Sequence, residues 1–164
     1  MDRIVPVSQP TSTPDDAIID ADSRQLVDLW TCSQVVLRFT AHFDAGEHAE
    51  METYFAPDGV WFQARGPIYG RIELRERMAS MPANQLMRHV LTNIRPTIVG
   101  TDLAVVDSYF TVYLQTTSTG ELPVTTSGPR NVGRYHDVLK RVEGRWLVAE
   151  RTVHFDLKID PSTA

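Results

Sequence analysis

The sequence contains a single cysteine, Cys32, in 164 residues. An internal disulfide is therefore excluded, and no metal site is predicted, because no cysteine or histidine spacing typical of metal ligands occurs. Basic clusters are missing as well, and the net charge is −5, which argues against nucleic acid or an anionic membrane as the partner. No apolar run approaches the roughly 20 residues that a membrane-spanning helix requires.

Signals for targeting and for common cofactors are also missing. Residues 1–14 hold no long apolar segment of the kind found in signal peptides, so a reduced, cytoplasmic setting is expected. The 9 glycines are scattered over turns and form no loop of the kind that binds phosphate, nucleotide or flavin. The sequence thus predicts no cofactor.

The composition is that of an ordinary globular domain, with 42% hydrophobic and 23% charged residues. A chain of this length can bury one substantial core. Residues 1–20 include three prolines among serine, threonine and aspartate, and we expect them to form a flexible arm. The domain is expected to span residues 21–157, followed by a frayed tail at residues 158–164.

Helical periodicity is clearest at the start of this domain. A helix is predicted from Asp22 or Ser23 to about residue 45. Residues spaced alternately by four and three positions form one stripe on it, namely Leu26, Trp30, Ser33, Leu37, Thr40 and Asp44. Burying the carboxylate of Asp44 without a partner would be costly, so Asp44 either lies at an exposed helix end or has a partner inside. Shorter helices are predicted over residues 47–55 and 71–80.

The rest of the chain reads mainly as β-strands. Strands are predicted at residues 60–63, 89–99, 103–117, 132–142 and 146–155. Pro96 interrupts the second of these and indicates a bulge or a sheet edge. Three helices followed mostly by strands are typical of an α+β fold. We expect a cone-shaped, curved antiparallel or mixed sheet that wraps around the helices, with a pocket inside the cone.

The segment 88–93 is expected to form a wall of that pocket. Alternate residues of a strand share a face, so His89 points to the same side as Leu91 and Asn93. The sequence leaves open which face is the inner one. An imidazole near a leucine and an amide on one face suggests a binding site.

Several short segments occur in an order and spacing that resemble a known family: Phe43–Asp44, Phe55–Trp61, Arg88–Asn93, Gly133–Asp137 and Gly144–Trp146. They resemble the SnoaL-like branch of the nuclear transport factor two-like superfamily, to which scytalone dehydratase belongs. The resemblance covers about residues 26–155 and implies the cone fold. The superfamily also includes bile-acid dehydratases, polyketide cyclases, ketosteroid isomerases and the non-catalytic small subunits of ring-hydroxylating dioxygenases, so the fold alone does not define an activity.

The resemblance is closest to the dehydratases, which carry an aspartate at the end of the first helix and a histidine on the strand after the third. Those positions match Asp44 and His89. Other site positions differ in residue type: Phe43 and Gln63 replace two tyrosines, Tyr135 replaces an asparagine, Leu114 replaces a second histidine, and Val112 lies near an aspartate position. The complete site of each characterised type is therefore missing.

His89 and Asp44 are the candidate catalytic pair. A carboxylate beside an imidazole fixes the tautomer of the ring and makes it a general acid or base, although such a pair can also be purely structural. Tyr135 or Asn93 would hold a substrate carbonyl. Alternatively, Asn93 caps backbone groups near Pro96, and Tyr135 is a core aromatic residue.

The expected lining of the pocket is mostly apolar. It comprises Trp61, Met78, Met81, Phe110, Val112 and Leu114, with Phe43 and Gln63 at substrate-binding positions implied by the resemblance. Such a lining suits a small hydrophobic cyclic ligand related to polyketides, steroids or terpenoids. In the alternative, these side chains fill the cone and leave no cavity.

Two functions are consistent with these features. The first is a cofactor-free dehydratase, isomerase or cyclase that uses His89 and Asp44. The second is a non-catalytic ligand-binding module, or a small subunit resembling that of ring-hydroxylating dioxygenases. The outer face of strand 103–117 carries Tyr109 and Tyr113, and an aromatic face of this kind predicts a homodimer formed sheet to sheet.

Overall fold

The computed structural model describes residues 14–116 and 121–158. The elements follow in the order α1 (Pro14–Ala45), α2 (His48–Glu52), β1 (Phe55–Phe62), β2 (Ile68–Tyr69), α3 (Gly70–Ala79), β3 (Gln85–Ile98), β4 (Leu103–Thr116), β5 (Asn131–Val142) and β6 (Arg145–Lys158). Helices therefore precede and interrupt the short strands, and four long strands follow. The predicted α+β fold is confirmed.

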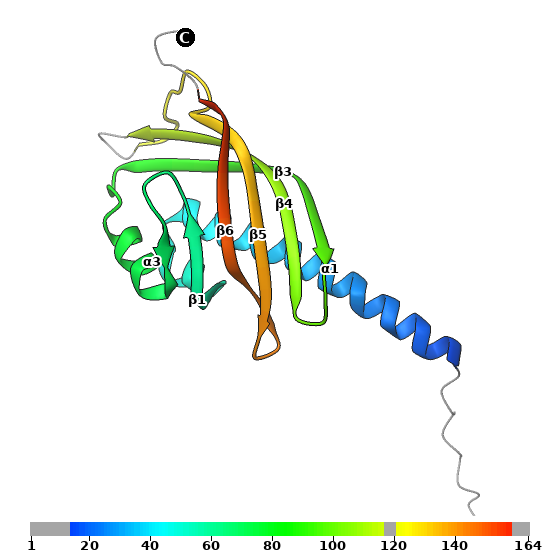
Figure 1. Cartoon of the computed structure of the whole chain (residues 1–164). Helices are drawn as coiled ribbons and strands as arrows, with labels where there is room; N and C mark the ends of the chain where they lie inside the picture. The colour runs from blue at the N-terminus through cyan, green and yellow to red at the C-terminus, as the bar shows by residue number, and fades with distance from the viewer. Residues whose placement is uncertain (1–13, 117–120, 159–164) are drawn as a thin grey trace, which may run out of the picture.

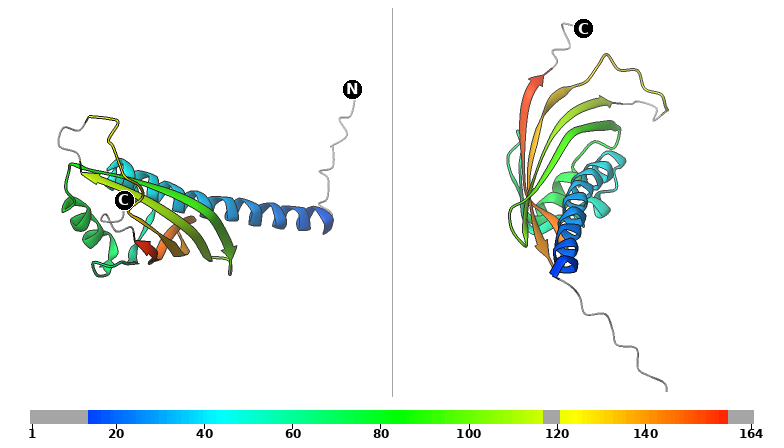
Figure 2. Two further views of the ribbon diagram at one scale, coloured as in Figure 1. Left: turned by 90° about the horizontal axis from the view of Figure 1, so that it is seen from above. Right: turned by 90° about the vertical axis from the view of Figure 1, so that its right-hand side faces the viewer.

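All the strands belong to one mixed sheet. Its order is β2-β1-β6-β5-β4-β3, with β1 parallel to β6 and every other neighbouring pair antiparallel. The long strands curve around α1, which lies on their concave side (Figures 1 and 2). The sheet stays open between its edge strands β2 and β3, so the cone has a mouth.

The first helix is longer than the sequence predicted. It begins at Pro14 rather than at Asp22 or Ser23, and a proline fits the first helical turn because its missing N–H has no partner there. The predicted arm over residues 1–20 is therefore helical from Pro14 onward. Residues 1–13 and 159–164, which include most of the predicted tail, lie outside the described residues.

The predicted stripe on α1 is wrong in its first half. Leu26 and Trp30 are 66% and 62% exposed, because the N-terminal half of the helix extends past the sheet (Figure 2). The buried side is rotated toward Cys32, Val36 and Phe39 instead, and these three side chains are inaccessible to solvent. Burial also raises the pKa of the Cys32 thiol to about 12, in keeping with a packing role.

One carboxylate ties the exposed part of α1 to the sheet. Asp28 accepts hydrogen bonds from Trp146 Nε1 at 2.9 Å and from Arg141 Nη2 at 2.8 Å. The Arg141 guanidinium also stacks on the Trp146 ring, 4.3 Å from its centroid. Although burial alone would raise the pKa of Asp28, the bonds to Trp146 and Arg141 outweigh it and lower the pKa.

This anchor predicts an acid-sensitive attachment of α1. Because the folded protein holds the pKa of Asp28 below its ordinary value of about 4, the stabilisation is fully present above that value. It is lost as the pH falls through the lower folded pKa. We expect the free energy of unfolding to depend less on pH below about 4 in Asp28→Asn than in the natural protein. Urea denaturation at pH 2.5–5 tests this, and equal slopes for both proteins would contradict it.

A bulge divides β3 into two parts. The pairing with β4 shifts between Thr92 and Arg95, and Asn93 has a left-handed backbone conformation with φ 51°. Both interpretations of the Pro96 signal hold in part, since β3 is an edge strand and has a bulge. The bulge is centred near Asn93, however, and Pro96 remains paired opposite Val106.

The concave side of the sheet holds the core. The larger cluster packs α1 and α3 against the sheet and includes Phe39, Phe55, Trp61, Leu74, Val106 and Val148. A smaller cluster joins Phe110, Val112 and Tyr135 on β4 and β5. On the convex side Tyr109 is 43% exposed, and the homodimer across that face stays a prediction. Within the described part of the chain, no helix is long and apolar enough to cross a membrane.

Candidate active site

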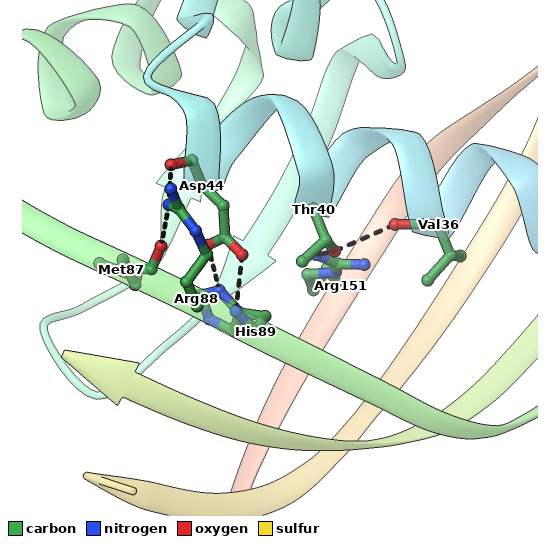
Figure 3. Close-up of polar contacts among 7 residues, drawn as sticks. All are labelled: Val36, Thr40, Asp44, Met87, Arg88, His89 and Arg151. Carbon is green, nitrogen blue, oxygen red and sulfur yellow. Dashed lines mark hydrogen bonds and ion pairs between the residues drawn. The ribbon is translucent and has the colours of Figure 1, made fainter. Parts of the chain in front are cut away.

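The last turn of α1 meets the middle of β3 through two residues far apart in sequence. Oδ1 of Asp44 lies 2.6 Å from Nδ1 of His89, and Oδ2 accepts a hydrogen bond from the backbone N–H of His89, also at 2.6 Å (Figure 3). The side chains are 11% and 5% exposed, respectively. The sequence left open whether Asp44 has a partner inside, and His89 is that partner.

A neighbouring arginine fixes the same junction. Nη1 of Arg88 donates to the backbone carbonyl of Asp44 at 2.9 Å and to that of Met87 at 2.6 Å. Carbonyls in the last turn of a helix lack intrahelical partners, so Arg88 satisfies one of them. The helix end is thereby held against β3 by side-chain and backbone contacts together (Figure 3).

The contact determines how the imidazole is protonated. An ionised carboxylate can only accept hydrogen bonds, so Nδ1 of His89 carries a proton and donates the hydrogen bond that Asp44 accepts. In the neutral ring Nε2 then holds a lone pair. The ring lies among aromatic side chains, with centroid distances of 5.6 Å to Phe43, 6.3 Å to Phe110 and 6.4 Å to Tyr135.

His89 lines a cavity of about 230 Å³ inside the cone. A cavity of this size suits a small ligand of one or two rings. Ten residues that the sequence predicted at the site or in its lining border it: Phe43, Trp61, Gln63, Met78, Met81, His89, Phe110, Val112, Leu114 and Tyr135. Asp44 lies behind His89 and borders a separate groove between α1 and β3.

Two buried donors on the cavity wall have no hydrogen-bond partner. They are Nε1 of Trp61 and Nε2 of Gln63, which are inaccessible to solvent. Trp61 is only 4% exposed, and its ring packs edge-on against Phe43 at 5.7 Å. Buried polar groups are nearly always satisfied, so a small shift of these side chains is expected to bring their N–H groups to a water or ligand acceptor.

The sequence matches the model of the SnoaL-like domain family over residues 24–152. The chain belongs to this family. The predicted resemblance is therefore confirmed, and it covers nearly the whole of the described domain. No protein of curated function is similar enough in sequence to match the chain.

Solved structures share the architecture of this SnoaL-like domain at low sequence identity. A protein of unknown function from Mycobacterium tuberculosis is 23% identical, with a TM-score of 0.70 over 87% of this chain and 80% of that one. A candidate scytalone dehydratase from Novosphingobium aromaticivorans is 18% identical, with a TM-score of 0.70 over 85% and 91%. A hexachlorocyclohexane dehydrochlorinase is 11% identical, with a TM-score of 0.69 over 85% and 94%. These similarities establish the fold.

One candidate of the SnoaL-like domain lies outside the cavity. Asn93 is exposed and does not line the site, although it lies four residues from His89 on the same strand. The bulge explains the difference, because the backbone leaves its regular alternation at Asn93 and Ile94 packs against the core in its place. The predicted role of Asn93 in holding a carbonyl is therefore wrong.

Tyr135 is a core aromatic residue that also lines the cavity, and its role in holding a substrate carbonyl stays a prediction. It lines the cavity, is 4% exposed, and stacks on Phe110 with centroids 4.4 Å apart. The Arg151 guanidinium lies on its ring at 4.3 Å. Burial raises the pKa of the Tyr135 phenol well above its usual range, so it stays protonated and can act only as a neutral group.

Arg151 is part of a buried polar network beneath the cavity wall. Its Nε and Nη2 donate to the two carboxylate oxygens of Asp137 at 2.6 Å and 3.0 Å, and Nη1 reaches Thr40 Oγ1 at 3.4 Å. The side chains of Arg151 and Asp137 are at most 2% exposed, because they point to the concave side under α1.

Sequence reasoning missed the polar part of the lining. Arg65, Arg77, Gln85, Arg130 and Asn131 also border the cavity. They lie in connections or at the ends of elements, where no periodic pattern indicates which way a side chain points. Among residues 22–116 and 121–158, no cluster of acidic residues, histidine and cysteine could hold a metal ion.

Proposed function

We propose that this SnoaL-like domain catalyses proton transfer on a small hydrophobic cyclic substrate, with loss of water or movement of a double bond. The proposal is carried by the two hydrogen bonds that Asp44 accepts from His89, one from Nδ1 of the ring and one from the backbone N–H. It leaves Nε2 as the one free basic atom of a ring that lines an apolar cavity. A positioned imidazole of this kind is the commonest general acid and base.

The steps balance without any further group. Nε2 of His89 removes a proton from the carbon next to a substrate carbonyl, and the electron pair forms a carbon–carbon double bond as the carbonyl becomes an enolate. The enolate then reforms the carbonyl and expels hydroxide from the β-carbon, and Nε2 returns its proton to give water. Asp44 stabilises the imidazolium that exists between these steps.

The carbonyl oxygen needs donors as negative charge develops on it. Nε1 of Trp61 and Nε2 of Gln63 are the unpaired donors of the cavity wall. Donors that are fixed in a dry site stabilise an oxyanion strongly, because they need not reorganise during the reaction. We assign this role to Trp61 and Gln63 in place of Asn93.

The tautomer of His89 tests the geometry. In the natural protein the neutral ring is expected to carry its proton on Nδ1, and in Asp44→Leu this preference should be lost. The nitrogen chemical shifts of ¹⁵N-labelled histidine report the tautomer. His136, which pairs with Asp107 at 2.8 Å on the outer face, is an internal reference that should not change. An unchanged His89 tautomer in Asp44→Leu would contradict the proposed pair.

Turnover tests the activity itself. A panel of one- and two-ring β-hydroxyketones should lose water in the presence of the protein, as followed by the ultraviolet absorbance of the enone. His89→Gln is expected to lower the rate about a hundredfold, whereas the matched outer-face change His136→Gln should have no effect. If no member of the panel reacts, or if both variants behave alike, the protein is a ligand-binding module and not an enzyme of this class.

A further inference from the structure

We propose that the mouth of the cavity binds an anionic group, so that the ligand is a hydrophobic ring system carrying a carboxylate or a phosphate ester. This inference names the substrate class and rests on the proposed function for the identity of the site. Its basis is a group of three arginines at the cavity, Arg65, Arg77 and Arg130, called the mouth arginines below.

The mouth arginines come from three separate parts of the chain. Arg65 lies in the connection between β1 and β2, Arg77 in the last turn of α3, and Arg130 directly before β5. Arg65 and Arg130 are exposed and Arg77 is half-buried, whereas most of the apolar lining is buried or half-buried. The charges therefore form a rim, and the apolar side chains and His89 lie deeper.

The described lining of the cavity carries positive charge and no acidic side chain. Among the described residues, no aspartate or glutamate lines the cavity, and none of the mouth arginines forms an ion pair. The chain as a whole has a net charge of −5, so the positive charge of the three arginines at this opening is opposite in sign to the charge of the whole protein. A cleft lined by charge of one sign attracts ligands of the opposite sign.

The shape of the site determines how such a ligand would lie. Its ring system would fill the apolar interior against Phe43 and Phe110, and its anionic group would remain at the rim in contact with guanidinium groups. Arginine suits this role, because its planar donors match carboxylate and phosphate oxygens. The anion would also orient the ring, with one edge always directed toward His89.

Binding of matched probes tests the inference. Naphthalene-2-carboxylate and 2-naphthyl phosphate represent the two anionic sources, and naphthalene-2-carboxamide is their neutral counterpart. Isothermal titration at low salt should give at least about fivefold tighter binding for one of the anions than for the carboxamide. The preference should weaken as sodium chloride is raised, because salt screens exposed charges.

Substitutions locate the effect. Arg65→Gln, Arg77→Gln and Arg130→Gln should each weaken anion binding about two- to fivefold, and the triple variant should remove the preference over the carboxamide. Arg145→Gln is the control, because Arg145 is an exposed arginine at the start of β6 and does not line the cavity. The inference would be overturned if the natural protein bound the anions and the carboxamide equally, or bound neither. It would also be overturned if Arg145→Gln weakened anion binding as much as the substitutions of the mouth arginines do.

The same probes separate this inference from the proposed function. Repeating the titrations in His89→Gln removes any contribution of the imidazole to anion binding. If His89→Gln still prefers the anions and the natural protein does not remove water from the β-hydroxyketones, the proposed chemistry fails and the anion site stands. If water loss depends on His89 but the preference is absent, the chemistry stands and the anion site fails.

Discussion

Replacing Arg151 with methionine is expected to lower the free energy of unfolding by about 3–5 kcal/mol. The change would leave the carboxylate of Asp137, which is completely buried, without its two charge-assisted hydrogen bonds. Although burial alone would lower the pKa of Arg151, the attraction of Asp137 raises it, so the guanidinium stays charged. Removing one member of a buried ion pair exposes the full cost of desolvating the other.

Chemical denaturation at pH 7 measures this loss of stability. Two further variants show whether the loss comes from the buried, unpaired charge. Arg134→Met removes an equally bidentate pair, with Asp156, but one that is exposed on both sides, and it should cost only a small fraction as much. The double variant Arg151→Met/Asp137→Leu should recover much of the loss, because it leaves no uncompensated charge. Equal losses in Arg151→Met and Arg134→Met would show that the buried network adds no special stability.

Gly133→Ala is expected to destabilise the fold by about 3 kcal/mol or more, as overpacking at a rigid contact does. A Cβ at this position would lie 2.1 Å from the backbone oxygen of His154 and 2.7 Å from Cζ of Phe110. The first neighbour is backbone and cannot rotate away. The second is a buried ring of the cavity wall, so any adjustment would also reshape the site.

Thermal unfolding followed by circular dichroism measures the consequence of Gly133→Ala. Gly100 provides the control, because its Cβ would meet nothing within 4 Å and its backbone is not left-handed. Gly100→Ala is therefore expected to be neutral or slightly stabilising, since alanine restricts the unfolded chain. A comparable loss in both variants would mean that the sheet relaxes easily around position 133.

The fold and most of the cavity could be predicted because they follow from repeating patterns. Alternation on β4 placed Phe110, Val112 and Leu114 on the inner face, and the structure has all three at the cavity. A carboxylate at the end of a mostly apolar stripe left two possibilities for Asp44, an exposed helix end or a partner inside, and the contact with His89 decides for the second.

The predictions that were wrong or missing concern positions where no repeating pattern applies. The stripe on α1 continued to Leu26 and Trp30, but helical periodicity does not show where the covering sheet ends. Alternation put Asn93 beside His89, but a bulge requires only one residue in a left-handed conformation, which asparagine adopts without a sequence signal of its own. The rim of arginines was missed because side-chain direction in connections depends on tertiary packing.

The bulge at Asn93 has a consequence for how this strand can change. The extra residue of the bulge shifts the alternation of the strand by one position. Odd-numbered residues such as His89 and Leu91 face the interior before it, and even-numbered residues such as Ile94 and Ile98 face the interior after it. Deleting one residue there would remove the extra residue and restore a regular strand, with His89, Leu91, Ile94 and Ile98 still on the inner face. A single deletion elsewhere in β3, with the bulge kept, would instead turn the adjoining part of the strand outward. The bulge is therefore a position at which the strand can lose one residue without changing which side chains face the cavity.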